Sequence, residues 1–403
     1  MNIIWGIFGI FVVLGIALLF SQNRRHINIR TILIGLLIQL IFAFIVLKWE
    51  AGRAGLNWVS MRVQDVINFA NEGISFLFGS LSNTEEFGVI FAINVLTIII
   101  FFSSLISVLY FLGIMQWFIK IIGGGLSKLL GTSMTESMSA AANIFVGQTE
   151  APLVIHPYLA SMTNSELFAV MTGGLASVAG SVLVGYALLG VPLEYLLAAS
   201  FMAAPAGLVL AKMILPQTED SQIKDFEMAK DTDSVNVIDA AARGASDGLQ
   251  LALNVGAMLL AFIALIALIN GILSGLGSIF GYDALSLEGI LGVIFSPLAF
   301  AVGVPWSEAI TAGSFIGQKL VLNEFVAYSS FAPQINQLSE KTVIVVSFAL
   351  CGFANFSSMA ILLGGLGGMA PSRRPDIAKM GLRAVAAGML ASLLNAAIAG
   401  MFI

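Results

Sequence analysis

Two short polar stretches interrupt a chain that is otherwise dominated by Leu, Ile, Val, Ala, Gly and Phe. One reads VGQTEAP over residues 146–152, and the other reads NEFVAY over residues 323–328. An amide such as that of Gln148 both donates and accepts hydrogen bonds, whereas ionised carboxylates such as Glu150 and Glu324 only accept them. Side chains of these types could bind a polar solute or help to coordinate a cation.

The two stretches belong to a repeated unit. Residues 131–150 (GTSMTESMSAAANIFVGQTE) and 303–324 (GVPWSEAITAGSFIGQKLVLNE) each contain a Gly, a Glu five residues later, small residues, a Gly-Gln pair and a second Glu. The segments that follow also match, because GLASVAGS from Gly174 and GFANFSSM from Gly352 place Gly, Ala and small or polar residues at the same offsets. We interpret the two halves of the chain as duplicated.

Composition indicates that these units lie in a membrane. The chain of 403 residues is 58% hydrophobic and only 10% charged, far more apolar than a soluble core of this size requires. A helix needs about 20 apolar residues to cross about 30 Å of hydrocarbon. The sequence therefore predicts an all-α multi-pass membrane protein with about eight transmembrane helices, over residues 3–20, 32–47, 89–119, 167–189, 191–211, 251–276, 343–363 and 380–403.

Basic residues indicate the orientation of these spans. Lys and Arg gather in residues 23–30, 212–243 and 372–383, which all fall on the cytoplasmic side if the N-terminus is outside. Residues 217–235 are rich in charge and read as a cytoplasmic linker. Residues 56–82 mix polar and apolar positions and could form an amphipathic helix at the outer interface, with an ordinary loop as the alternative.

The repeated units predict two re-entrant helical hairpins. Three spans separate the units, so they should enter the membrane from opposite faces as an inverted repeat, and each is interrupted by Gly or Pro. A carboxylate near the bilayer midplane costs about 2.5–3.5 kcal/mol on insertion scales, which makes Glu150 and Glu324 functional candidates. The alternative is that each Glu only binds the free N–H groups of its own hairpin tip.

Other chemistry finds little support. One cysteine, Cys351, excludes an intrachain disulfide, and with His26 and His156 as the only histidines a zinc site is improbable. The G-x-S-x-G match at residues 244–248 lacks the strand and the histidine of a hydrolase, and no Walker lysine motif occurs. We therefore expect no enzyme and no cofactor, and the duplicated hairpins favour a transporter over a channel.

The motif GQKLVLNEFVAY, at residues 317–328, resembles the signature of the concentrative nucleoside transporters, as do VGQTEAPLV, GGLASVAGS and CGFANFSS. The resemblance covers essentially the whole chain. It implies a homotrimer in the lipid bilayer of the bacterial cytoplasmic (inner) membrane. This homotrimer would import nucleosides such as uridine together with sodium by an elevator-type mechanism. No nucleic acid is expected as a partner. A proton-coupled symporter is the alternative.

The resemblance also implies a division into domains. Residues 1–120 would be mainly scaffold helices that form the trimer, and residues 243–280 would be a further scaffold helix. Residues 121–214 would hold hairpin 1 and two core helices, and residues 281–403 hairpin 2 and two more core helices. Residues 215–242 would be the cytoplasmic linker.

Site residues follow from the same resemblance. Gln148, Thr149 and Glu150 should face the nucleobase with Val182 packed against it. Glu324, Asn355 and Ser358 should hold the ribose, beside Phe353. The sodium site maps to the carbonyls of Asn143, Val146 and Val178 with the Ser177 hydroxyl, and hard cations prefer such oxygen ligands. Preference for purine or pyrimidine, and the ion-to-substrate ratio, are left open.

Overall fold

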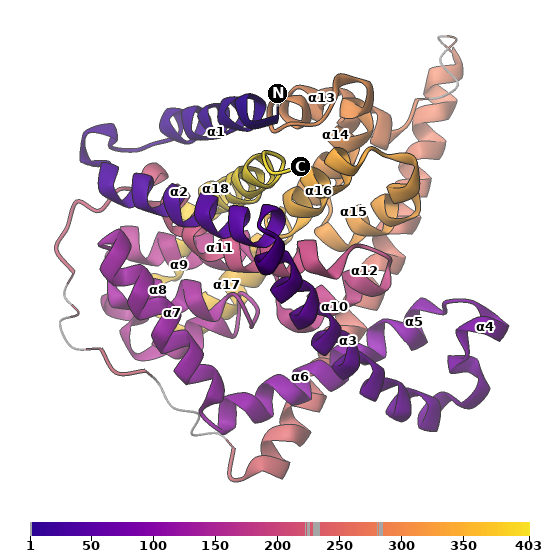
Figure 1. Ribbon diagram of the computed structural model, residues 1–403, viewed down its shortest axis with the longest axis horizontal. Helices are drawn as coiled ribbons and strands as arrows, with labels where there is room; N and C mark the ends of the chain where they lie inside the picture. Colours follow the sequence, from indigo (N-terminus) through magenta and orange to yellow (C-terminus); the bar gives the residue numbers. More distant parts are fainter. Residues whose placement is uncertain (1, 222, 224–225, 229–233, 280, 282–284) are drawn as a thin grey trace.

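The computed structural model describes residues 2–221, 223, 226–228, 234–279, 281 and 285–403, and no β-strand occurs in this part of the chain. Its helices pack into one body with the two chain ends close together (Figure 1), where the Asn2 amide donates to the carbonyl of Ile403 over 2.6 Å. The α-helices are α1 (Asn2–Leu19), α2 (Ile29–Ala43), α3 (Glu50–Phe78), α4 (Thr84–Phe87), α5 (Phe91–Asn94), α6 (Leu96–Phe111), α7 (Ile114–Leu130), α8 (Met134–Ala142), α9 (Asn164–Ala176), α10 (Gly180–Leu188), α11 (Leu193–Ile214), α12 (Val237–Ile279), α13 (Leu287–Ala301), α14 (Trp306–Val321), α15 (Glu324–Phe331), α16 (Glu340–Leu350), α17 (Ser358–Met369) and α18 (Arg374–Ala399).

Seven helical segments in the described residues are long and apolar enough to cross a membrane, and the bent pair α13 and α14 would add an eighth if counted as one span. They account for every predicted span except 343–363. The seven are Asn2–Leu19, Ile29–Lys48, Phe91–Phe111, Asn164–Leu188, Leu193–Ile214, Val237–Ile279 and Pro371–Ala399.

Three predicted spans are not single helices. The apolar run 89–119 is divided, because α6 ends at Phe111 and Gly113 adopts a left-handed conformation with φ of +78° before α7 begins. Residues 343–363 are divided between α16 and α17, and residues 167–189 between α9 and α10, with a non-helical segment at each break. Hydropathy alone cannot see such breaks, since the residues that flank them stay apolar.

Both repeated units fold back on themselves. In the first, α8 is followed by a turn and by a 3-10 segment, Ala151–Ser161, that packs along α8. In the second, α15 returns along α14, and the Ser330 hydroxyl donates to Gln318 Oε1 over 2.8 Å. Each unit thus folds back on itself, although the two are built from different kinds of helix.

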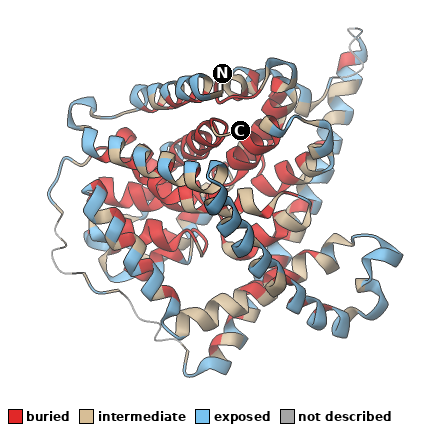
Figure 2. Ribbon diagram, in the orientation of Figure 1, coloured by how far each residue is buried: buried red, intermediate tan, exposed pale blue. Residues whose placement is uncertain are grey.

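Burial separates an inner group of helices from an outer one (Figure 2). Of the residues in the best apolar window of each span, 94% are buried in Asn164–Leu188 and 83% in Pro371–Ala399, against 17% in each of Phe91–Phe111 and Val237–Ile279. The inner group contains the helices that follow each hairpin. Long α12 packs along α6 at the outside.

The predicted amphipathic segment is helical, although its bounds differ. Helix α3 begins at Glu50 and ends at Phe78, earlier at both ends than the predicted range 56–82. Most of its side chains stay exposed, and those of Ile67, Ala70 and Ile74 are buried on one face. The predicted linker at 217–235 lies partly outside the described residues.

The first Glu of each repeated unit has a structural role. Glu136 closes a capping box with Ser133 at the start of α8 and forms a buried ion pair with Lys212 of α11 at 2.6 Å. Glu308, near the start of α14, accepts from the hydroxyl of Ser339 over 2.7 Å at the start of α16. Both carboxylates therefore tie a hairpin entrance to a neighbouring helix.

The G-x-S-x-G match serves helix packing. A Cβ atom on Gly244 would lie 2.5 Å from Cβ of Ser107, and one on Gly248 would lie 2.8 Å from Cα of Ile100, both on α6. Two small residues four positions apart let α12 approach the backbone of α6 closely. The pattern marks a helix contact rather than a nucleophile.

We expect Gly248→Ala to lower the melting temperature of the detergent-solubilised protein, because the added methyl group would force α12 away from α6 at a cost of about 1–3 kcal/mol. The matched control is Gly271→Ala in the same helix, where a Cβ would meet nothing within 4 Å. The control should melt at the same or a slightly higher temperature. Equal melting of the two variants would contradict the close contact.

Candidate functional site

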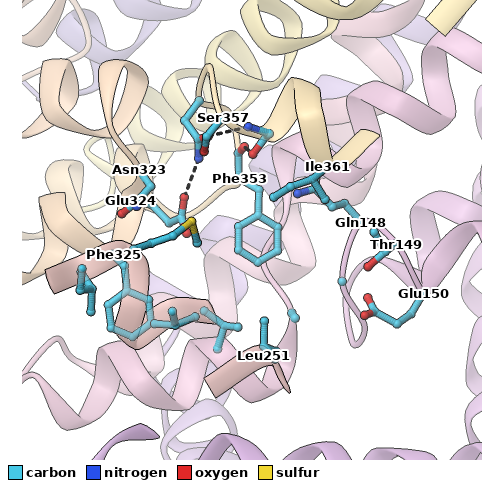
Figure 3. A pocket seen from close by; sticks show the side chains of 18 residues that line it. Gln148, Thr149, Glu150, Leu251, Asn323, Glu324, Phe325, Phe353, Ser357 and Ile361 are labelled. Atoms are coloured by element: carbon cyan, nitrogen blue, oxygen red, sulfur yellow. Dashed lines mark hydrogen bonds between the residues drawn. The ribbon is translucent and has the colours of Figure 1, made fainter. Parts of the chain in front are cut away.

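A cavity lies between the two hairpin tips, the interruptions of the core helices and α12 (Figure 3). The predicted side chains of the first tip lie on one side and Glu324 on the other, with the Phe353 ring between them. All eight residues predicted to bind the solute line this cavity, namely Gln148, Thr149, Glu150, Val182, Glu324, Phe353, Asn355 and Ser358. Four separate segments of the chain thus converge on one place.

Glu324 begins α15 and is held on both of its oxygens. Oε1 accepts from the hydroxyl of Tyr186 over 3.1 Å, and Oε2 accepts from Nδ2 of Asn355 over 3.0 Å. The preceding Asn323 caps the helix, since its Oδ1 accepts from the amide of Val326 over 2.8 Å. A carboxylate in the first turn also benefits from the positive end of the helix dipole. The buried charge is therefore fixed in place with lone pairs left for a ligand.

Aromatic packing keeps the Tyr186 hydroxyl on Glu324. The Tyr186 ring stacks on Tyr328 with 4.4 Å between centroids and meets Phe325 edge-on at 4.9 Å. Tyr328 in turn donates its hydroxyl to the carbonyl of Ser347 over 2.7 Å. These fully buried rings leave the tyrosine little freedom, so the orientation of the carboxylate is set by packing as well as by hydrogen bonds.

The interruption between α16 and α17 presents the other polar groups. Oδ1 of Asn355 accepts from the Ser358 amide over 2.9 Å and from the Ser357 hydroxyl over 2.7 Å, which leaves its Nδ2 for Glu324. The Ser358 hydroxyl donates to the carbonyl of Phe353 over 2.6 Å. Asn355 and Ser358 therefore lie together, as their spacing of three residues predicts.

The first hairpin tip presents a less satisfied set of groups. Oε1 of Gln148 is buried and has no hydrogen-bond partner among the described residues, whereas the Glu150 side chain is exposed toward the cavity. A Cβ on Gly174 would lie 2.8 Å from Cβ of Gln148, and one on Gly365 would lie 2.8 Å from Cγ2 of Thr149. Glycines on two core helices thus make room for the tip, which offers an amide and a carboxylate to a ligand.

The residues predicted to hold sodium lie where hairpin 1 meets the interruption between α9 and α10. The two segments are joined by the Gly180 amide, which donates to the carbonyl of Phe145 over 3.0 Å. Oδ1 of Asn143 is buried without a hydrogen-bond partner in the described chain, and the Ser177 hydroxyl donates to the carbonyl of Gly173 over 3.1 Å. An unpartnered acceptor oxygen beside non-helical backbone suits a hard cation.

Sequence reasoning missed one wall of the cavity. Helix α12 contributes apolar side chains to the cavity, and no pattern within its long apolar run singled them out. The lining residues that were not predicted are Gly147, Ala179, Leu251, Val255, Met258, Leu259, Asn323, Phe325, Ser357 and Ile361.

The Gly-Gln pair of the second unit differs from that of the first. Gln318 lies within α14, is hydrogen-bonded to Ser314 and Ser330, and does not line the cavity.

Comparison with known families covers almost the whole chain. Residues 8–81 match the N-terminal part of the Na+ dependent nucleoside transporters, residues 92–193 the nucleoside recognition Gate domain and residues 195–400 the C-terminal part of the Na+ dependent nucleoside transporters.

Individual relatives agree with the family matches. The nucleoside permease NupC of Helicobacter pylori is 52% identical over 99% of this chain and 98% of its own. An uncharacterized transporter of Bacillus subtilis, YutK, is 64% identical over the full length of both chains. Structures of CNTnw, 55% identical, cover 100% of this chain and 98% of their own, with TM-scores of 0.96 in an outward-facing state and 0.95 in an inward-facing substrate-bound state. The chain belongs to the concentrative nucleoside transporter family, and it is a transporter rather than an enzyme.

Proposed function

We propose that this protein imports nucleosides, with uridine among them, across a bacterial inner membrane together with sodium. The observation that carries the proposal is the cavity in which Gln148 and Glu150 of one hairpin face Glu324 and Asn355 of the other. Family membership supports nucleoside symport and a sodium-dependent mode of action. The residue roles that the resemblance implies are part of this proposal, and the contacts in the cavity support them.

The first hairpin tip suits the nucleobase. The free Oε1 of Gln148 and the exposed carboxylate of Glu150 can accept hydrogen bonds from base N–H groups, while the Gln148 amide can donate to a base carbonyl. Val182 and the Phe353 ring supply apolar surface for the faces of the base. A ligand that left the Gln148 oxygen unpaired would lose the hydrogen bond that the buried group requires.

The second hairpin suits the ribose. Glu324 has free lone pairs beside its bonds to Tyr186 and Asn355, and it can accept from two neighbouring hydroxyl groups. Ser358 lines the same cavity, and its hydroxyl oxygen can accept a further hydrogen bond. Bonds from a hydroxyl to an ionised group are worth about 1.5–3 kcal/mol. We therefore assign discrimination for the sugar to this half of the site.

Sodium binding would act directly on the nucleoside site. The proposed ligands Asn143 and Val146 lie just before the tip residue Gln148 in the chain, and the carbonyl of Ser177 accepts from the amide of Phe353 over 3.1 Å. An ion that orders these two segments would also order groups that face the nucleoside. Such shared order makes each ligand raise the affinity for the other, as coupled import requires.

An elevator-type motion fits the distribution of burial. We assign residues 121–214 and 281–403 to a moving transport domain and residues 1–120 and 243–280 to a scaffold that forms a homotrimer, with residues 215–242 as the linker. The exposed apolar side chains of α12 are available for contacts between subunits. Solved relatives in outward-facing and inward-facing states support alternating access.

Uptake into liposomes tests the function. Liposomes that contain the purified protein should accumulate labelled uridine under an inward sodium gradient. The initial rate of uptake should saturate as the uridine concentration rises. Accumulation driven equally well by a proton gradient without sodium would favour the proton-coupled alternative. Accumulation of another solute but not of uridine would refute the proposal.

The carboxylates give a sharper prediction. Glu150→Gln and Glu324→Gln should each lower the initial rate of uridine uptake by at least tenfold, because a charge-assisted hydrogen bond to the ligand is lost. Glu340→Gln, at an exposed position in the first turn of α16, is the control and should transport normally. The assembly should keep its size in detergent in all three variants. Normal uptake by both site variants would leave these carboxylates with a structural role only.

Sodium dependence should respond to the hydroxyl of Ser177. We expect Ser177→Ala to raise the sodium concentration for half-maximal uptake about tenfold, which corresponds to about 1.4 kcal/mol. The maximal rate at saturating sodium should change little. Ser296→Ala removes a hydroxyl that donates within α13, to Val293, and should leave the sodium curve in place. An unchanged curve for Ser177→Ala would place the ion elsewhere.

A further inference from the structure

The second repeat contains a buried cation that the nucleoside site does not use. Lys319 lies on α14 near its end, and its side chain is fully buried, with 0% exposure. Its Nζ donates to the carbonyl of Ala349 over 2.7 Å and to Oγ of Ser392 over 3.0 Å. No carboxylate in the described part of the chain lies within ion-pair distance of it. The protein therefore keeps a charge in its interior with neutral oxygens as direct partners.

The partners of this ammonium group lie at the end of a half-helix. Ala349 is the residue before the last in α16, and the final carbonyls of a helix lack partners within the helix. They also carry the negative end of the helix dipole, which favours a cation. Ser392 in turn donates to the carbonyl of Cys351 over 3.2 Å. Lys319 thus stabilises the point at which α16 stops.

The first repeat has no lysine at the matching position. There, α9 ends at Ala176, and Ser200 of α11 donates to the carbonyl of Ile144 in hairpin 1 over 2.9 Å. The proposed sodium site lies between the hairpin and the end of α9. In sequence, Lys319 directly follows the Gly-Gln pair of its unit, where the first unit has Thr149.

We infer that Lys319 is a positioning residue of the nucleoside site and acts as the built-in cation of the second repeat. By holding the end of α16, it keeps Phe353 and Asn355 beside Glu324. The inference rests on the proposed function, since it takes the cavity beside Glu324 to bind a nucleoside.

The first test measures uridine binding to the purified full-length protein by calorimetry in sodium chloride. It separates the contribution of the charge of Lys319 from that of its hydrogen bonds. Lys319→Gln keeps a donor group without the charge and should weaken uridine binding at least tenfold. The control is Lys341→Met, which removes a lysine near the start of α16 that contacts Asn2 and the Trp5 ring. This variant should bind uridine within twofold of the wild type. Binding by Lys319→Gln within threefold of the wild type would overturn the inference.

Chemical rescue supplies a second measurement that does not depend on a stable variant. Lys319→Ala leaves a space at the end of α16 into which methylammonium, but not methanol, should bind. Methylammonium should therefore raise the melting temperature of Lys319→Ala and leave that of the wild type unchanged. A melting temperature that methylammonium does not raise would overturn the inference.

The two proposals can fail separately. A wild-type protein that binds no uridine in sodium refutes the proposed function, and the methylammonium shift then still decides whether the second repeat requires a cation. Conversely, sodium-dependent binding by the wild type together with an unshifted Lys319→Ala variant refutes only the role of Lys319.

Discussion

The arrangement of the site depends on one backbone hydrogen bond, which the amide of Phe353 donates to the carbonyl of Ser177 over 3.1 Å. Both residues lie where a core helix is interrupted, and an unpaired backbone group costs several kcal/mol in hydrocarbon. The bond pairs one backbone group of each interruption with one of the other. Gly352 permits the approach, because a Cβ there would lie 3.0 Å from the carbonyl oxygen of Ala176. The halves of a duplicated chain are thereby joined at the place where each has lost its helix.

This junction explains why the polar groups of four segments converge. With the interruptions joined, each hairpin tip can contact the other half of the molecule. Thr149 packs against Gly365, where a Cβ would lie 2.8 Å from its Cγ2, and Glu324 accepts from Tyr186 as well as from Asn355 of its own half. The same bond connects Ser177, on the proposed ion side, with Phe353, on the nucleoside side. Coupling between the two ligands then needs no long pathway, since one hydrogen bond separates the segments that they order.

Sequence predicted the polar half of the cavity better than the apolar half. Gln148 and Glu324 stand out because polar groups are costly in hydrocarbon and are kept there for a reason. Val255 and Met258 of α12 carry no such signal, since an apolar residue in a spanning helix contacts lipid, protein or ligand equally well. The break at Gly113 escaped for a related reason: hydropathy reports what the side chains prefer, and a backbone turn among apolar residues leaves it unchanged.

The tips of the two repeated units differ in chemistry, and proline accounts for the difference. Pro152 and Pro157 deny the first return segment the hydrogen bonds of an α-helix, so it forms a 3-10 segment, and buried polar atoms such as Oδ1 of Asn143 and Oε1 of Gln148 remain unpartnered beside it. The second return begins as a regular α-helix capped by Asn323, which places Glu324 in its first turn with its direction set. An irregular tip has free oxygens for an ion and an adaptable amide for a base, whereas a regular tip presents one fixed carboxylate. In the function that we propose, the two repeats would suit the two unlike ends of a nucleoside because their backbones, and not only their side chains, differ.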